Sequence, residues 1–514
     1  MNNNSASALR WLTKPTFVIL LLALLLRLPL LDGSFWLDEA AQALESARPF
    51  SQQLEIIPDF QPPLMHYLLH FAMYFSSSEW WLRLVGAVIP GLIAIAASYN
   101  LANKMFGKTT ATLTSLLLAT SSFHIFFSQE LRPYSLAAMW AALAFLQLYK
   151  LANKHSSKNA QQHFGRAWLP LTLFNLLGIY SSYLYPFVLI SQLLVIVLLN
   201  KKLLTNFLKS AAITAIGFLP FLPIFLQQLA AGQQLRTTVP GWELVVSHPQ
   251  LQALPLTLGK FVFGVIRLEV NQFFVGVSLF IAAVTLILTT FTHRQQQNKP
   301  QTLKPWIFLL TIILSSLLIP WLVSFMIPVI QPKRVMYLQP LIYIFLTGLA
   351  TQSWKKLPLL VKSLSTALII LLFVINLFGS YRYYTQPALQ RENWRELVAY
   401  TQARLPNHQT IAVFAFDEPF APWRWYAGDH FSTLAPGKQI PADLTEVQEQ
   451  LKPIYDYQFV ILFEYLQDLT DPHHHLQQAI ESFGYEEFEV LDYPGIGFIR
   501  IYVKDKELLL SSLR

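Results

Sequence analysis

The stretch PTFVILLLALLLRLPLLDGSFWLDEA, residues 15–40, joins a long apolar run to a short acidic sequence. A membrane-spanning helix needs roughly 20 mostly apolar residues, and residues 15–32 meet that length. The preceding segment lacks a small-residue cleavage site, so we expect an uncleaved first helix and not a removed signal peptide. Asp38 and Glu39 follow soon after this helix, behind the aromatic pair Phe35-Trp36. The stretch therefore predicts a membrane protein whose first loop carries carboxylates at the water–lipid boundary.

The composition of the whole chain also indicates a membrane protein. Its 514 residues are 54% hydrophobic and only 13% charged, whereas soluble domains carry nearer a quarter charged residues. Residues 383–514 hold ten basic and nineteen acidic side chains, which leaves 27 basic and ten acidic ones in the first 382. Basic charge confined to short loops is typical of membrane insertion and excludes a nucleic-acid patch. There is no cysteine, so disulfides and thiolate metal sites are excluded.

Eleven apolar segments are predicted to span the membrane, and their odd number places the two termini on opposite sides. They lie near residues 15–32, 81–103, 109–127, 134–152, 167–184, 185–200, 205–228, 270–292, 305–328, 335–352 and 362–381. The loops on the N-terminal side hold seventeen cations and no acid, which predicts that this side is cytoplasmic. The cations are Arg10, Lys14, Lys104, Lys108, Lys150, Lys154, Lys158, Arg166, Lys201, Lys202, Lys209, Arg294, Lys299, Lys304, Lys355, Lys356 and Lys362. The pair 167–200 is short for two spans and could be partly re-entrant.

The opposite, exoplasmic face is expected to receive the long first loop 33–80, short loops around 128–134 and 329–334, and a loop at 229–269 that could dip into the membrane. From residue 383 the pattern becomes that of a soluble α/β domain, with strands alternating with helices. We predict helices at Glu392–Arg404 and His473–Phe483, and strands at Thr410–Phe416, Tyr457–Glu464, Glu486–Asp492 and Gly497–Val503. The expected domains are therefore 1–382, transmembrane and catalytic, and 383–514, soluble and exoplasmic.

The first candidate site is Asp38-Glu39 in the first loop. A general base at this boundary could meet both a soluble hydroxyl and a lipid headgroup. If the stretch begins a helix, adjacent residues point about 100° apart, so both acids cannot face one reacting atom. The alternative is that both are N-terminal helix charges favoured by the helix dipole.

The second candidate site surrounds the double proline Pro62-Pro63, which fixes φ and withholds two backbone donors before a helix can start. Asp59 could be an acid/base or a ligand, or it could cap that helix. Gln61 directly precedes the prolines. His66 follows them and could take part in catalysis, although a hydrogen-bonding structural role at the membrane interface also suits it.

A third candidate is SQELRPYS, residues 128–135, a very short connection between two predicted helices. Glu130 and Arg132 could form a local ion pair, or they could serve a site together with Tyr134, because charged groups beside a membrane are expensive to place without a use.

The fourth candidate is QPKRVMY, residues 331–337, where two cations stand at the exoplasmic end of a helix against the general charge trend. Phosphate is the ligand that best suits Lys333 and Arg334 together, with Tyr337 nearby. The alternative ligand is ordinary anionic phospholipid. Arg27, near the end of the first helix, is a further intramembrane cation that could bind a substrate.

Together these motifs resemble the GT-C superfamily of membrane glycosyltransferases. The residues that carry the resemblance are WLDEA (36–40), QPPL (61–64), WLRL (81–84), SQELRPY (128–134) and, more weakly, KRVMY (333–337). The nearest likeness is to the bacterial branch related to protein O-mannosyltransferases and the aminoarabinose transferase of lipid A. The implied fold is a polytopic α-helical membrane protein with about eleven transmembrane helices, N-in/C-out, and a C-terminal exoplasmic α/β domain.

The resemblance implies a polyprenyl-phosphate sugar donor, transfer on the exoplasmic side, and a first-loop Asp acting near the acceptor. Asp38 matches that position and Glu130 the second acidic position, whereas Gln61 stands where relatives often carry a charged or imidazole residue. The catalytic candidates are Asp38, Glu39, Asp59 and Glu130; the substrate-binding candidates are Gln61, His66, Arg132, Tyr134, Lys333, Arg334 and Tyr337.

The expected partners are the lipid-linked donor, membrane lipids and a lipid, glycan or protein acceptor, in a bacterial inner membrane. No cofactor is required by the pattern, although Asp38, Asp59 or Glu130 could hold a divalent metal. Two alternatives remain. A polytopic transporter usually has paired repeats and ionisable residues near mid-membrane, whereas here the acids cluster in the first exoplasmic loop and no repeat is evident. A non-catalytic assembly protein for envelope polysaccharide should tolerate loss of Asp38.

Overall fold

The computed structural model describes residues 15–152, 164–238, 250–265, 272–296, 304–327, 329–352, 354, 357–415, 419–435 and 443–504. The chain divides into two compact units. The first comprises Met1–Leu31, Phe50–Gln227 and Val246–Thr385, and the second comprises Asp32–Pro49, Gln228–Val245 and Gln386–Arg514. Seven of the predicted cytoplasmic cations lie outside the described residues: Arg10, Lys14, Lys154, Lys158, Lys299, Lys355 and Lys356.

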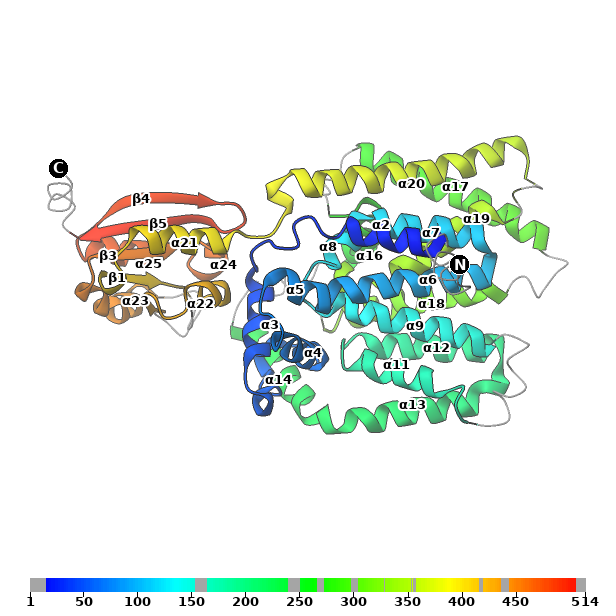
Figure 1. Ribbon diagram of the computed structural model, residues 1–514, viewed down its shortest axis with the longest axis horizontal. Helices are drawn as coiled ribbons and strands as arrows, with labels where there is room; N and C mark the ends of the chain where they lie inside the picture. The colour runs from blue at the N-terminus through cyan, green and yellow to red at the C-terminus, as the bar shows by residue number, and fades with distance from the viewer. Residues whose placement is uncertain are drawn as a thin grey trace, which may run out of the picture. The chain divides into compact units, whose positions relative to one another are not determined.

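The first unit is built from apolar helices that pack side by side (Figure 1). Its helices are α2 Pro15–Leu25, α4 Leu64–Met73, α5 Glu79–Arg83, α6 Ile89–Phe106, α7 Lys108–Thr120, α8 Ser122–Phe127, α9 Tyr134–Ala152, α11 Leu169–Ile179, α12 Tyr185–Leu199, α13 Leu204–Phe218, α16 Gln250–Phe263, α17 Gln272–Gln296, α18 Lys304–Val323, α19 Leu338–Thr351 and α20 Leu359–Thr385. Helix α14, Leu222–Thr238, begins in this unit, and its residues from Gln228 onward belong to the second unit. A π-helical turn, Leu84–Val88, joins α5 to α6.

Six helical stretches of the described residues are long and apolar enough to cross a membrane: Glu79–Phe106, Tyr134–Ala152, Lys201–Gln234, Gln272–Arg294, Lys304–Val323 and Leu359–Thr385. Each of the eleven predicted spans contains a helix, and shorter apolar helices account for most of the others. The prediction of a polytopic helical membrane protein is confirmed, while the number and direction of the crossings stay predictions.

Several helices are shorter than predicted, for identifiable local reasons. The first helix ends at Leu25, and turns follow up to Gly33. The predicted span 109–127 is divided at Ser121, whose extended backbone ends α7 and whose hydroxyl caps α8 by accepting from the His124 N–H at 3.4 Å. The apolar half of the loop at 229–269 forms α16, which packs into the bundle because Gln339 and Tyr343 donate to the Phe261 carbonyl at 2.9 and 3.1 Å.

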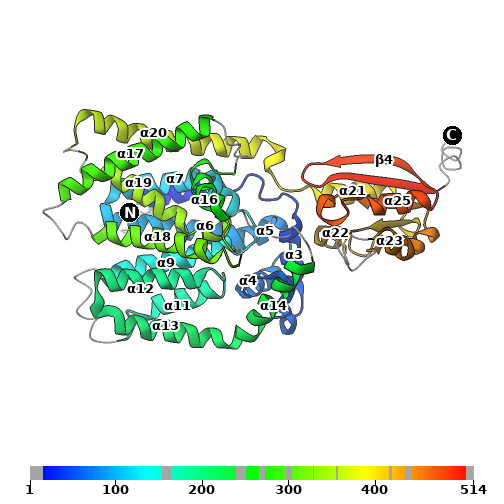
Figure 2. The same ribbon diagram turned by 180° about the vertical axis from the view of Figure 1, so that it is seen from behind.

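The second unit contains a five-stranded mixed sheet (Figure 2). The strands are β1 Thr410–Val413, β2 Ser432–Leu434, β3 Phe459–Phe463, β4 Tyr485–Tyr493 and β5 Gly497–Lys504, in the order β2-β1-β3-β5-β4. β1 pairs in parallel with β2 and β3, and β5 pairs antiparallel with β3 and β4. The helices are α3 Leu37–Ala47, α21 Trp394–Arg404, α22 Ala421–Ala427, α23 Leu444–Leu451, α24 Gln467–Thr470 and α25 His475–Ser482.

The central strands β1 and β3 are buried on both faces, as expected for strands between two helical layers. Alternate residues of β3 enter two separate cores: Phe459, Ile461 and Phe463 contact the core that includes α21 and α22, and Val460 and Leu462 contact the core that includes α23 and α25. The predicted α/β class is confirmed. β1 ends three residues before the predicted strand does, and Phe416 lies outside the described residues. The sequence analysis missed β2, α22 and α23.

Candidate active site

A buried cluster of polar side chains surrounds Asp59 in the first unit. One carboxylate oxygen, Oδ1, accepts a hydrogen bond from Nη1 of Arg132 at 3.0 Å. The other, Oδ2, lies 2.8 Å from Nε2 of His66, which is itself 3.2 Å from the amide nitrogen of Gln61. The Asp59 side chain is 5% exposed and His66 is fully buried. Four of the predicted site residues are thus brought together.

The charge state of this cluster follows from its geometry. Burial alone would raise the pKa of Asp59, but the charge of Arg132 and the hydrogen bond and charge of His66 outweigh it and hold that pKa below its ordinary value. Asp59 is therefore an ionised partner of Arg132 at neutral pH, which suits it to fix a cation in place. A carboxylate held in this way is a weak base.

The backbone around the double proline explains how Asp59 reaches these partners. Phe60 adopts a left-handed conformation, with φ of 51°, which turns the chain between Asp59 and the prolines. Helix α4 then begins at Leu64, whose N–H donates to the Tyr180 carbonyl at 3.0 Å. The alternative that Asp59 caps this helix is wrong, because its oxygens are directed at Arg132 and His66.

The connection between α8 and α9, together with the first residue of α9, supplies two further predicted residues, Glu130 and Tyr134, beside Arg132. Glu130 is buried, and its carbonyl accepts from the N–H of Arg132 at 2.7 Å. Tyr134 is the first residue of α9, and the ammonium group of Lys333 lies over its ring, 5.3 Å from the centroid. A cation at this distance from an aromatic face is attracted to it. Two cationic segments far apart in the sequence therefore meet here.

The remaining predicted cations and hydroxyls have defined places near this segment. Arg334 is half-buried and donates from Nη1 to the Val329 carbonyl at 3.1 Å, which closes its own loop. Tyr337 is buried in the bundle core just before α19. Lys333 is half-buried as well, so one of the two cations of this motif faces Tyr134 while the other braces the loop.

Arg27 has a structural role in this fold and is not a candidate ligand for substrate. Its guanidinium donates to the carbonyls of Ala23 at 2.7 Å and Ala119 at 3.3 Å, and Nη2 lies 2.9 Å from Nδ1 of His124. Gln129 then donates to the carbonyl of Arg27 itself at 2.8 Å. These bonds satisfy backbone carbonyls left free near the ends of α2 and α7.

Asp38 and Glu39 lie in the second unit, in the first turn of α3. The structure separates their environments. Glu39 is fully buried and its Oε2 lies 3.5 Å from Nε of Arg391, whereas Asp38 is only half-buried. Acids in the first turn also interact favourably with the helix dipole, so the helix-charge alternative remains open for Asp38.

Glu392, which the sequence analysis missed, lies beside these acids in the second unit. Its oxygens accept from the Trp394 indole N–H at 2.6 Å and the Tyr465 hydroxyl at 2.8 Å. Burial raises the pKa of Glu392 to about 7; hydrogen bonds from Trp394, Tyr465 and the Leu37 backbone oppose the rise, and the charge of Asp38 adds to it. The only sequence signal was an acid next to an Arg at the start of a predicted helix.

Known membrane glycosyltransferases have a similar architecture. Residues 60–226, about a third of the chain, match the family of dolichyl-phosphate-mannose-protein mannosyltransferases. ArnT from Cupriavidus metallidurans, solved with undecaprenyl phosphate, superposes with a TM-score of 0.57 at 12% identity over 96% of this chain and 98% of that one. The chain has the GT-C fold of ArnT. The archaeal oligosaccharyltransferase AglB from Archaeoglobus fulgidus, solved with an inhibitory peptide and dolichol-phosphate, gives 0.53 at 14% identity over 97% and 74%. No curated protein matches by sequence.

The part of the chain that matches the family covers most of the polar cluster but not the first-loop acids. Gln61, His66, Arg132 and Tyr134 fall within residues 60–226, while Asp38 lies outside them. Asp59 immediately precedes the matched region.

A divalent cation could take ligands from the same cluster. Carboxylate and imidazole are suitable ligand types, and Asp59 and His66 are among the described groups that could hold a metal ion. Another AglB structure from Archaeoglobus fulgidus contains Zn and sulfate. In this chain, however, Arg132 already neutralises Asp59, which weakens the attraction of that carboxylate for a second cation.

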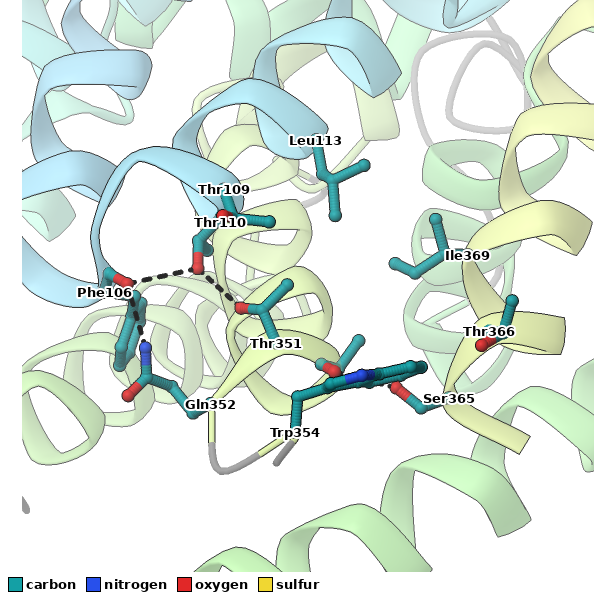
Figure 3. A pocket seen from close by; sticks show the side chains of 11 residues that line it. Phe106, Thr109, Thr110, Leu113, Thr351, Gln352, Trp354, Ser365, Thr366 and Ile369 are labelled. Atoms are coloured by element: carbon teal, nitrogen blue, oxygen red, sulfur yellow. Dashed lines mark hydrogen bonds between the residues drawn. The ribbon is translucent and has the colours of Figure 1, made fainter. Parts of the chain in front are cut away.

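A cavity of about 760 Å³ lies elsewhere in the helical unit, between residues near the ends of α6, α7, α19 and α20 (Figure 3). It is lined by Phe106, Thr109, Thr110, Leu113, Ala350, Thr351, Gln352, Trp354, Ser365, Thr366 and Ile369. Its polar groups largely bond to each other and to the backbone: the hydroxyls of Thr110 and Thr351 are 2.6 Å apart, and Gln352 donates to the Phe106 carbonyl at 2.9 Å. None of the predicted site residues lines this cavity.

Proposed function

We propose that this protein is a glycosyltransferase that moves a sugar from a polyprenyl-phosphate carrier to an acceptor hydroxyl. The observation that carries the proposal is the meeting of two cationic segments. Lys333 lies over the ring of Tyr134, and Arg132, two residues before Tyr134, is held by Asp59. Arg and Lys together suit phosphate, since Arg donates in a fixed fork and Lys adds a compact charge. Such groups would stabilise the charge of a departing phosphate.

The relatives support the choice of donor. ArnT was solved with undecaprenyl phosphate and AglB with a dolichol-phosphate, both of which are polyprenyl-type carriers. A chain with the same fold, spanning nearly the whole of ArnT, is well suited to the same class of lipid. The acceptor in this proposal is a hydroxyl on a lipid, a glycan or a protein of the cell envelope.

The proposed reaction needs a base for the incoming hydroxyl and cations for the leaving group. Asp38 takes the hydroxyl proton as the acceptor oxygen bonds to the anomeric carbon. The bond between that carbon and the phosphate oxygen breaks, and polyprenyl phosphate leaves with its charge stabilised by Arg132, Lys333 and Arg334. Glu39, Asp59 and Glu130 are the alternative bases. Asp59 is the least suited of them, because Arg132 and His66 already engage it.

Attack opposite the phosphate predicts inversion at the anomeric carbon. The check is the configuration of the product, read by NMR after transfer from a donor of known configuration. A product that keeps the donor's configuration would require a covalent intermediate and would exclude this direct displacement.

We further propose that transfer takes place on the exoplasmic side of a bacterial inner membrane. The support is the cation-rich, acid-free set of loops on the N-terminal side, which is typical of a cytoplasmic face. In this arrangement residues 1–382 form the catalytic membrane domain and residues 383–514 an exoplasmic domain. Labelling of single cysteines introduced at Lys108 and Glu481 with an impermeant reagent tests the two faces, because the chain has no other cysteine.

The decisive experiment measures release of free polyprenyl phosphate from a panel of polyprenyl-phosphate sugars, with wild-type protein beside Asp38→Asn. Envelope extract supplies possible acceptors. Release by wild type alone would support a lipid-dependent glycosyltransferase with Asp38 as base. Equal release by both would keep the enzyme and move the base to another acid. Release from no donor would favour a transporter or an assembly protein.

Metal dependence is tested in the same assay with excess chelator. Full activity in chelator would exclude a required divalent metal, and loss that is restored by one added cation would support a metal at Asp59 and His66.

A further inference from the structure

The segment that carries Asp38 is fastened to the C-terminal part of the second unit by a series of contacts. The Phe35 N–H donates to the Tyr426 hydroxyl oxygen of α22 at 2.7 Å, and the Phe35 ring packs edge-on against Trp425 at 5.7 Å. Leu37 packs against the apolar core around α21 and α22. The segment 32–37 is therefore ordered by residues that lie more than 350 positions later in the sequence.

The residues just before α21 make the contacts closest to the acids. Arg391 pairs with Glu39 at 3.5 Å, and the backbone N–H of Leu37 lies close enough to the Glu392 carboxylate to lower its pKa. Leu37 is the first residue of α3, so this N–H has no partner within the helix. The residue at the usual capping position is Trp36, which makes no side-chain cap. Glu392 therefore takes the place of an N-cap for α3.

The carboxylate of Glu392 is itself closely held. Trp394 and Tyr465 bind its two oxygens. Gly495, with φ of 83°, lies so close that an added Cβ would come within 3.2 Å of the Glu392 Cα. The titratable groups that face Glu392 are Asp38 from α3 and Tyr465 after β3. Its side chain can shift little without displacing a neighbour.

We propose that Arg391 and Glu392 are positioning residues for the transfer reaction. Arg391 engages Glu39, and Glu392 fixes the start of α3, so that the direction of Asp38 on its first turn is set by the C-terminal domain. Because adjacent helical residues point about 100° apart, holding Glu39 towards Arg391 leaves Asp38 as the acid of this pair that can approach substrate. This inference rests on the proposed function, in which Asp38 is the base.

The first measurement is hydrogen exchange of full-length protein in lipid nanodiscs, read on peptides from residues 33–47. Glu392→Ala removes the acceptor for the Leu37 N–H, and we expect exchange at the start of α3 to rise about tenfold, the effect of losing one hydrogen bond to a charged group. Glu392→Gln keeps an acceptor oxygen and should retain most of the protection. Glu396→Gln, an equal change of charge on exposed α21 surface, is the control and should change nothing.

The second measurement is turnover of the same variants with the donor that wild type uses. We expect Glu392→Ala to lower kcat about tenfold or more with the donor KM unchanged, since the donor phosphate is assigned to Arg132 and Lys333. Tyr426→Phe, which removes only the oxygen that accepts from Phe35, should change both readouts in the same direction and serves if Glu392→Ala does not fold.

The outcomes separate this inference from the proposed function. Unchanged exchange in both Glu392→Ala and Tyr426→Phe would overturn the positioning of α3. Raised exchange with wild-type kcat would show that the contact is only structural and would overturn the role in transfer. If wild type releases polyprenyl phosphate from no donor, the proposed function fails and the catalytic role falls with it, while exchange still decides whether Glu392 holds α3.

Discussion

Asp59 in the first unit and Glu392 in the second are both carboxylates withdrawn from water, but their neighbours have opposite effects. Asp59 has Arg132 at 3.0 Å, so its pKa falls despite burial. Glu392 has neutral donors and the acid Asp38 near it, so its pKa rises to about 7. The comparison teaches that burial alone does not decide the charge of an acid in this protein; the presence of a cation does.

The largest expected effect comes from removing the cation beside Asp59. Arg132→Gln leaves a buried carboxylate without its charge partner, and such losses destabilise a protein by about 3–5 kcal/mol. The variant should unfold at a markedly lower temperature in detergent and lose polyprenyl-phosphate release. Arg132→Lys is the matched control, because it keeps the charge and loses only the fixed geometry.

The double variant Asp59→Asn with Arg132→Gln separates stability from function. With no charge left in the pair, most of the lost stability should return, while activity should stay low because Arg132 is assigned to the donor phosphate. Recovered activity in the double variant would contradict that assignment and leave Arg132 a structural role only.

Glu392→Gln should raise the stability of the fold, whereas Arg132→Gln lowers it. A carboxyl whose pKa is about 7 in the folded state and near 4.5 in the unfolded state stabilises the fold fully below pH 4.5 and loses that contribution as pH rises through 7. Glu392→Gln cannot ionise, so we expect little change at pH 4 and a relative stabilisation on the order of 2–3 kcal/mol at pH 8. Slow exchange of β1 and β3 amides in full-length protein measures it, and parallel pH profiles for wild type and variant would contradict it.

Glu39 provides a matched test within the same unit, because it pairs with the cation Arg391, whereas Glu392 has neutral hydrogen-bond donors. Glu39→Gln weakens its pairing with Arg391, and a hydrogen bond to a charged group contributes about 1.5–3 kcal/mol, here at the lower end because the distance is 3.5 Å. We therefore expect the Gln substitution to destabilise at Glu39 and to stabilise at Glu392 at pH 8. A cycle with Arg391→Gln isolates the pair; a coupling energy near zero would show that the cation is not what fixes Glu39.

Much of the architecture could be predicted from local sequence pattern. Long apolar runs identified where the bundle helices lie, since hydrophobic length is a property of each segment alone. Alternation and apolar runs identified β3, β4 and β5 and the helices at 392–404 and 473–483. Short, mostly polar elements such as β2, exposed along its edge, carried no such signal.

The candidate site was predicted less completely, because it depends on tertiary contacts. Motifs pointed to Asp59, His66 and Arg132 separately, but no spacing rule joins residue 59 to residue 132. The link between Leu37 and Glu392 is more distant still, and the sequence offered only an Arg-Glu pair before a helix. Arg27 shows the converse error: an intramembrane cation suggested a ligand, and the structure uses it to bind backbone carbonyls at a helix end.

The smallest expected effect concerns a cation that has an aromatic ring, and not an acid, beside it. Lys333 over Tyr134 should contribute about 0.5–1 kcal/mol. Tyr134→Phe keeps the ring face and should leave stability unchanged, while Tyr134→Leu should lower it by that amount. If the ring also directs Lys333 to the donor phosphate, Tyr134→Leu should raise the donor KM several-fold with little change in kcat. Equal donor KM values for Tyr134→Phe and Tyr134→Leu would mean that Lys333 reaches its position without the ring. Of the contacts compared here, only the acid–cation pairs would then set the geometry of the site.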